Sequence, residues 1–215
     1  MTAELHWMLM AGGIEQPLDP DFPPRYCIET IAHHLAQINR FTGATCRPYS
    51  VAEHSLLCAD LAAEAGCDRA TQLACLMHDA HEAVVGDVST PTKHQLGNAW
   101  HAYELRHCRA LRQHFGLRDT YLRAHTTVRQ MDLIALATER RDLLGWDAAH
   151  HLPWPILDKP GHAVHTAPVD LLSLWRTQRH WSEWRDAFLA RFDGLASAAT
   201  YTCATTTTAT GAAHA

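Results

Sequence analysis

Apolar residues recur at intervals of three and four along most of this chain, a spacing that places them on one face of an α-helix. The pattern predicts successive helices over residues 28–41, 50–66, 69–82, 90–115, 119–144 and 168–192. Signals for strands are weak, apart from a short hairpin expected before residue 22. We therefore predict an all-α fold.

Helix-start residues precede several of these segments. Ser50, with Glu53 three residues later, forms a capping box, and Asp68 can cap the next helix. Pro91 stands at the first turn of the segment 90–115, where its fixed φ suits a helix. We expect the apolar stripe of this helix to be buried along its whole length: Leu96, Trp100, Leu105, Cys108, Leu111 and Phe115.

Length and composition favour one domain. The chain has 215 residues, 47% of them hydrophobic, which is enough for one sizeable core. We assign residues 1–195 to a single helical domain with an irregular N-terminal segment, and expect residues 147–167, which contain three prolines, to be irregular. The tail 196–215 has a composition that cannot build a core and is expected to be disordered. Four aromatic residues on one side of the last helix are expected in the core or in a homodimer interface: Trp181, Trp184, Phe188 and Phe192.

Charge and cysteine usage exclude several classes of protein. The formal net charge is −5 and the 18 Lys and Arg residues are scattered, so polymeric nucleic acid is not an expected partner. Seven cysteines without a CxxC pair argue against a disulfide framework or a thiolate zinc site and favour a reducing cytoplasm. No signal peptide or membrane-length apolar stretch is found, so we expect a cytoplasmic protein without a membrane partner. Most of the 17 histidines, His107 among them, stand among polar neighbours and are expected to be exposed.

The doublet His78-Asp79 is the strongest candidate for chemistry, because it ends the apolar run 73–77. An unpaired buried carboxylate costs several kcal/mol, so a carboxylate in such a place is normally paired or bound to a metal. His54 and Asp132 stand where helical stripes would turn them inward, which gives a four-ligand set. Nitrogen and oxygen ligands suit one divalent ion, either Mn, Co, Mg, Fe, Ni or Zn. Glu82, three residues after Asp79, can project toward the same region.

These residues resemble the H…HD…D signature of the HD-domain metal-dependent phosphohydrolases. The segment HDAHEAVVGDVSTPTK (78–93) is similar to the HDxxExxxGDxxTPxK segment of the bacterial 5'-deoxynucleotidases. The Arg-aromatic pair of that family has its counterpart in NRF (39–41), with Arg40 placed 14 residues before His54. IETIAHHLAQINRFTG and RPYSVAEHS also resemble a group of bacterial and phage HD proteins. The resemblance spans residues 28–145 and implies an HD-domain helical bundle that forms a homodimer.

The resemblance implies a role for each matching residue. It assigns the divalent metal to four ligands: His54, His78, Asp79 and Asp132. Arg40 would contact phosphate, for which a guanidinium is well shaped, and Phe41, where the 5'-deoxynucleotidases have tryptophan, would pack near the sugar. Glu82 would orient or deprotonate the attacking water or relay a proton, and Asp87 would hold the substrate or act in proton transfer. The remaining substrate contacts would come from Val88, Ser89, Thr90 and Lys93, together with Asp79 and Asp132.

Each role has a plain structural alternative. Hydrogen bonds alone could satisfy the four ligand residues, a surface salt bridge could hold Arg40, and Phe41 could belong to the core. Glu82 could be an exposed helix-end carboxylate, and Asp87 could serve the turn that Gly86-Asp87 favours.

The implied activity is release of phosphate from 2'-deoxynucleoside 5'-monophosphates by a metal-activated water. Three alternatives stay open. A nucleoside triphosphate hydrolase of the same fold needs more cationic residues around the site. A dimetal HD oxygenase needs further histidine ligands, for which His81 is the candidate. A nucleotide sensor without activity would have no need of the Glu82 carboxylate.

Overall fold

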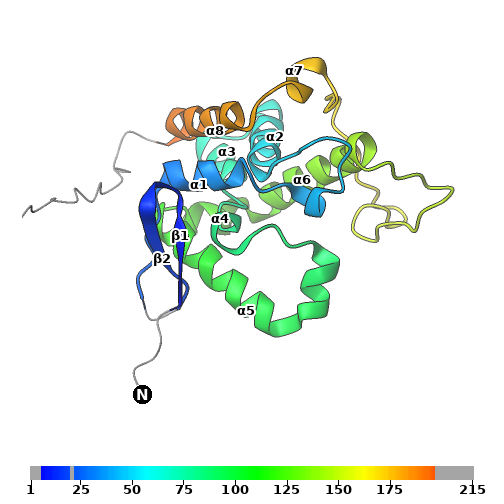
Figure 1. Cartoon of the computed structure of the whole chain (residues 1–215). Coiled ribbons are helices and arrows are strands. Elements are labelled where there is room, and N and C mark those ends of the chain that lie inside the picture. The colour runs from blue at the N-terminus through cyan, green and yellow to red at the C-terminus, as the bar shows by residue number, and fades with distance from the viewer. Residues whose placement is uncertain (1–5, 20–21, 197–215) are drawn as a thin grey trace, which may run out of the picture.

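Three helices form the centre of the fold in the computed structural model, which describes residues 6–19 and 22–196. These are α2 (Val51–Glu64), α3 (Arg69–Leu76) and α6 (Arg118–Leu143), and each packs against the other two. The helices α1 (Ile28–Leu35) and α8 (Trp181–Leu195) cover this centre, with α8 against α1, α2 and α3 (Figure 1). The all-α prediction is therefore confirmed.

The remaining elements are short, apart from one long helix. Strands β1 (Trp7–Met10) and β2 (Ile14–Pro17) form the expected antiparallel hairpin, joined by the 3-10 turn η1 (Ala11–Gly13). A second 3-10 turn and three helices complete the fold: η2 (Arg40–Gly43), α4 (Glu82–Val85), α5 (Thr90–His114) and α7 (Leu174–Thr177). None of the helices in the described ranges combines the length and the apolar character needed to cross a bilayer.

The predicted caps are present, with one change. The Ser50 hydroxyl accepts a hydrogen bond from the Glu53 backbone N–H, 3.2 Å away, and the Asp68 carboxylate accepts one from the Thr71 N–H, 2.7 Å away. The Glu53 carboxylate does not accept a hydrogen bond from the Ser50 backbone N–H, because it accepts hydrogen bonds from the guanidiniums of Arg47 and Arg176 instead. The capping box predicted at Ser50 is therefore only half formed.

Three predicted helix boundaries are wrong. The helix from residue 28 ends at Leu35, because the backbone of residues 38–40 pairs with residues 49–51: the Arg40 N–H donates to the Tyr49 carbonyl and the Val51 N–H to the Ile38 carbonyl. The segment 69–82 breaks after Leu76 into tight turns, so His78 and Asp79 lie between α3 and α4. The last long helix begins at Trp181 instead of Pro168.

The buried stripe predicted for α5 is correct only in its second half. Leu96 is 52% exposed, whereas Cys108, Leu111 and Phe115 are buried. Gly97 has φ 70° and ψ −152°, a conformation that glycine alone adopts freely, and it interrupts the helix. The bend of α5 leads its first part away from the central helices (Figure 1). His107, expected to be exposed, lies on the packed half and is buried.

The C-terminal aromatic residues belong to the core, which was one of the two predicted locations. Trp184, Phe188 and Phe192 are buried in the main hydrophobic cluster, and Trp181 is partly buried against it. Residues 147–167 contain no helix or strand and, as expected, run irregularly beyond the end of α6 (Figure 1). The tail was predicted over residues 196–215, all of which except Ala196 lie outside the described residues.

Candidate metal centre

Four predicted ligand residues meet at one point. We call His54, His78, Asp79 and Asp132 the four-residue cluster. The Nε2 atom of His54 lies 3.2 Å from His78 Nε2, 3.6 Å from Asp79 Oδ2 and 3.5 Å from Asp132 Oδ1. The Nε2 atom of His78 lies 3.1 Å from Asp79 Oδ2 and 3.9 Å from Asp132 Oδ1. Two imidazole nitrogens and two carboxylate oxygens thus surround one small volume.

The packing of the three central helices brings these side chains together. His54 lies in the first turn of α2, His78 and Asp79 lie in the turn after α3, and Asp132 lies midway along α6. Each of these helices contacts the other two, so their facing sides share one interior region. The break after Leu76 places the doublet in a turn, where consecutive side chains can both reach the cluster.

Both histidines are held through their other ring nitrogen. Nδ1 of His54 donates to Glu139 Oε1 at 2.5 Å, and Nδ1 of His78 donates to the Cys75 carbonyl at 2.7 Å. This arrangement leaves the two Nε2 atoms turned toward the carboxylates of the cluster. Metal-binding histidines usually show this pattern, in which the second nitrogen is fixed by a carboxylate or a backbone carbonyl.

The carboxylates of the cluster are suited to holding a cation. Burial opposes ionisation of Asp79, but His78, His54 and Arg40 outweigh it and hold the pKa of Asp79 well below its ordinary value. Burial likewise opposes ionisation of Asp132, and the two histidines of the cluster lower the pKa of Asp132. Both groups are therefore negatively charged at neutral pH.

Cys58 adds a sulfur atom that sequence reasoning had set aside. It lies one turn after His54 on α2, is buried, and places Sγ 3.6 Å from His54 Nε2. The buried group of His54, Cys58 and His78 could bind a metal ion. A search for CxxC pairs misses such a residue, whereas the i, i+4 spacing of His54 and Cys58 on one helix face reveals it.

Glu139 is a second residue that sequence reasoning missed. It is fully buried on α6 and binds two site residues, accepting from His54 Nδ1 and pairing with Arg40 NH2 at 3.1 Å. Burial opposes its ionisation, but Arg40 and His54 prevail and lower the pKa of Glu139. Its signal in the sequence is the seven-residue interval after Asp132, two helical turns on the same face.

Arg40 lies inside the site, not in a surface salt bridge. Its guanidinium lies 3.1 Å from Glu139 and 3.6 Å from Asp79 Oδ2, and its buried Nε has no hydrogen-bond partner among the described residues. Phe41 is outside the core cluster and faces Trp154, with ring centroids 6.4 Å apart. It and Thr42 have φ 55°, which is unfavourable for residues with a Cβ and is often found beside functional sites.

Glu82 is buried, in contrast to the exposed carboxylate that was the plain alternative. Burial and the Asp79 and Asp87 carboxylates raise the pKa of Glu82 well above its ordinary value, and its Oε2 has no hydrogen-bond partner among the described side chains. Asp87 is half-buried, and burial together with Asp79 raises its pKa despite the opposing effect of Arg40. Both groups share the electrostatic environment of Asp79 and Arg40.

A cavity of about 300 Å³ opens beside the four-residue cluster. Three members of the cluster line it, His78, Asp79 and Asp132. The cations in its wall are Lys93, Arg112 and Arg129, joined by His81, His101 and His125. Carboxylates share this wall: Glu104 pairs with Lys93 and Asp132 with Arg129, which leaves Arg112, over the Tyr121 ring, as the wall cation without a carboxylate partner among the described residues.

Of the remaining residues predicted to contact the substrate, one lines this cavity and the others do not. Lys93 lines it and pairs with Glu104 at 2.5 Å. The other predicted residues are not in the cavity wall: Arg40, Phe41, Glu82, Asp87, Val88, Ser89 and Thr90. Val88 is half-buried, the Ser89 hydroxyl lies 2.8 Å from that of Thr92, and Thr90 is exposed. His81, the candidate for a second metal, places Nε2 3.6 Å from Glu104.

The chain is similar to two bacterial proteins. An uncharacterized protein of Rhodobacter capsulatus is 34% identical over 185 residues, which cover 81% of this chain and 93% of that protein. The uncharacterized protein YfdR of Escherichia coli is 38% identical over 131 residues, which cover 61% of this chain and 67% of YfdR. No model of a known protein family matches the chain.

Proposed function

The chain belongs to the family of the Rhodobacter capsulatus protein and YfdR, and from its site we propose that it is a metal-dependent phosphohydrolase acting on nucleotides. The observation that carries this proposal is the convergence of two histidine nitrogens and two carboxylates, with each histidine Nε2 atom 3.1–3.9 Å from both carboxylates, beside a cavity of about 300 Å³. The resemblance of these residues to the HD signature supports the same activity.

The residues fit a divalent metal ion. His54, His78, Asp79 and Asp132 would hold it, since two fixed imidazoles and two ionised carboxylates suit Mn, Co, Mg, Fe, Ni or Zn. Such an ion would lower the pKa of its bound water to about 7 and offset charge on a phosphoryl oxygen.

The neighbouring side chains supply the remaining chemistry. Arg40, whose guanidinium lies 3.6 Å from Asp79 Oδ2, can donate to a phosphoryl oxygen held at the cluster and so stabilise charge that develops there. Glu82, whose pKa is raised well above its ordinary value, can carry a proton to the leaving sugar oxygen. Asp87 can hold a sugar hydroxyl or accept a proton. Arg112 in the cavity wall, which has no carboxylate partner among the described residues, would attract the phosphate.

We propose 2'-deoxynucleoside 5'-monophosphates as substrates, with inorganic phosphate and the deoxynucleoside as products. A second candidate, a nucleoside triphosphate hydrolase, requires additional cations around the site. The cavity wall holds Lys93, Arg112 and Arg129, but Glu104 and Asp132 neutralise two of them, so its charge does not favour the more highly charged triphosphate.

Product analysis decides between these activities. Deoxy- and ribonucleoside mono- and triphosphates would be incubated with Mn, Co, Mg or a chelator, and the products separated by chromatography. Metal-dependent release of phosphate from deoxymonophosphates supports the first candidate, and release of triphosphate or pyrophosphate supports the second. Absence of turnover with every metal would contradict both.

The variant Asp79→Ala tests the link between metal and activity. It should lose bound metal and hydrolysis together, whereas Asp186→Ala, a matched change at an exposed site on α8, should keep both. Full hydrolysis by metal-stripped native protein would refute the proposal.

A further inference from the structure

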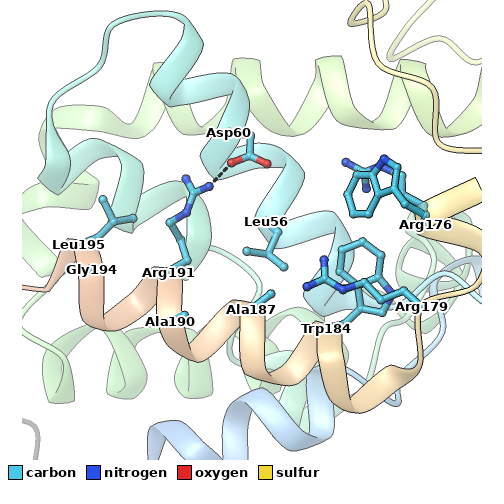
Figure 2. Close-up of a pocket in the computed structure, with 11 residues that line it drawn as sticks. Leu56, Asp60, Arg176, Arg179, Trp184, Ala187, Ala190, Arg191, Gly194 and Leu195 are labelled. Atoms are coloured by element: carbon cyan, nitrogen blue, oxygen red, sulfur yellow. Dashed lines mark hydrogen bonds and ion pairs between the residues drawn. The ribbon is translucent and has the colours of Figure 1, made fainter. Parts of the chain in front are cut away.

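A second cavity lies outside the metal centre, between α2, α7 and α8, and we call it the α2–α8 groove. Its volume is about 560 Å³, within the range of pockets that hold small organic ligands. Its floor is apolar, with Leu56 from α2 and Ala187 and Ala190 from α8. Figure 2 shows Leu56 between the Asp60–Arg191 ion pair at one end and Arg179 with Trp184 at the other.

The aromatic end of the groove presents flat faces. Arg176 Cζ lies 4.6 Å from the ring centroid of Trp175, and Arg179 Cζ lies 4.5 Å from that of Trp184. The two indole rings are 5.9 Å apart. Trp184 is buried, but Trp175 is 56% exposed, so one face of an indole is open to a further planar group.

The same end carries unsatisfied hydrogen-bond donors. Arg176 is 6% exposed and binds Glu53 through NH1, but its Nε has no partner among the described residues. The Arg179 guanidinium makes no ion pair or side-chain hydrogen bond within the described part of the chain. Arg191 is neutralised by Asp60. Arg179, over the Trp184 ring, is therefore the groove arginine without a carboxylate partner among the described residues.

We propose that the α2–α8 groove is a second ligand site, which binds a nucleoside phosphate. The base stacks on Trp175, and the phosphate accepts hydrogen bonds from the Arg179 guanidinium. A guanidinium matches phosphate geometry, and stacking on an indole tolerates any base. The proposal does not depend on the activity assigned to the metal centre, because none of the four cluster residues lines the groove.

Calorimetric titration with AMP in EDTA tests this site on the native chain and on Asp79→Ala. The expected result is about one equivalent of AMP bound to each, because the groove does not use the metal. Adenosine alone and inorganic phosphate alone should each bind at least about tenfold more weakly than AMP, since each makes half of the contacts. No AMP binding in EDTA, or phosphate binding as tightly as AMP, would overturn the proposal.

Groove variants locate the binding. Trp175→Leu should weaken AMP roughly 5- to 150-fold, the range for loss of one base–aromatic stack, and Arg179→Gln at least about tenfold. Both residues are outside the core and tolerate replacement. Arg185→Gln is the matched control, because Arg185 lies on α8 outside the groove and pairs with Asp186. Native affinity for AMP in both groove variants would refute the site. The site would also be refuted if the native chain did not bind AMP and Trp175→Leu converted an oligomer to monomers. The groove would then be an interface between copies of the chain.

Discussion

Replacement of Glu53 by glutamine should destabilise the fold strongly, although the side chain hardly changes shape. Glu53 is fully buried near the start of α2. Its carboxylate accepts hydrogen bonds from Arg47 NH1 at 2.9 Å, Arg47 NH2 at 2.7 Å and Arg176 NH1 at 2.8 Å. One carboxylate thus holds the segment before α2 and the short helix α7 against the core.

The expected loss follows from these contacts. Glu53→Gln removes the negative charge, and its amide NH2 can no longer accept from an Arg47 donor. Two guanidiniums then remain in the interior without a counter-charge. Removing one partner of a buried ion pair costs about 3–5 kcal/mol, a large part of the roughly 5–15 kcal/mol that holds a domain folded.

Urea unfolding followed by circular dichroism measures this loss. Glu64→Gln is the matched control, because Glu64 is exposed at the other end of the same helix, and it should change the free energy of unfolding by no more than about 0.5 kcal/mol. A loss below about 1 kcal/mol in Glu53→Gln would refute the view that the two arginines depend on this carboxylate.

Three further predictions concern metal, pH and backbone strain. A divalent metal at about 100 times its dissociation constant should stabilise the native chain by about 2.7 kcal/mol. Differential scanning calorimetry should show that the metal raises the Tm of the native chain and of Cys58→Ala, because nitrogen and oxygen ligands suffice, but not the Tm of Asp79→Ala. A metal-dependent rise in both variants or in neither would contradict this prediction. Burial, with Arg106 and His81, lowers the pKa of His107 from 6.5 to about 4. The folded state therefore binds this proton more weakly than the unfolded chain, and the free energy of unfolding should fall as the pH drops from 6.5 to about 4. The urea midpoint should fall less over this range in His107→Gln than in the native chain. Thr42 is exposed, β-branched and at φ 55°, so Thr42→Gly should raise the free energy of unfolding by about 1 kcal/mol, and a decrease would show that the hydroxyl has an unrecognised partner.

Local signals predicted the helices and the caps, but not where each helix stops. Apolar periodicity and the Asp68 cap depend on neighbouring residues, so the sequence shows them directly. The end of α1 at Leu35 depends on backbone pairing between residues 38–40 and 49–51, which periodicity does not contain. The exposure of Leu96 depends on the backbone conformation of Gly97, and that residue type permits a helix interruption without requiring one.

The candidate ligands were predictable for a similar reason, and their supporting residues were not. His54, His78 and Asp132 have ligand-type side chains on the inward faces of predicted helices. Glu139 and Cys58 are one or two turns away on the same faces, but a carboxylate or thiol there is informative only when its partner across the core is known. Only their contacts with His54 in the structure identify Glu139 and Cys58 as residues of the site.

The wide separation of the cluster residues along the chain has a consequence for folding. His54 and Asp132 bring together α2 and α6, and no short segment of the chain contains both. Closing so long a loop costs entropy before any contact between the two ends repays it. The high-affinity site should therefore be absent until α2, α3 and α6 have docked, so that capture of a metal during refolding marks the late assembly of the helical centre.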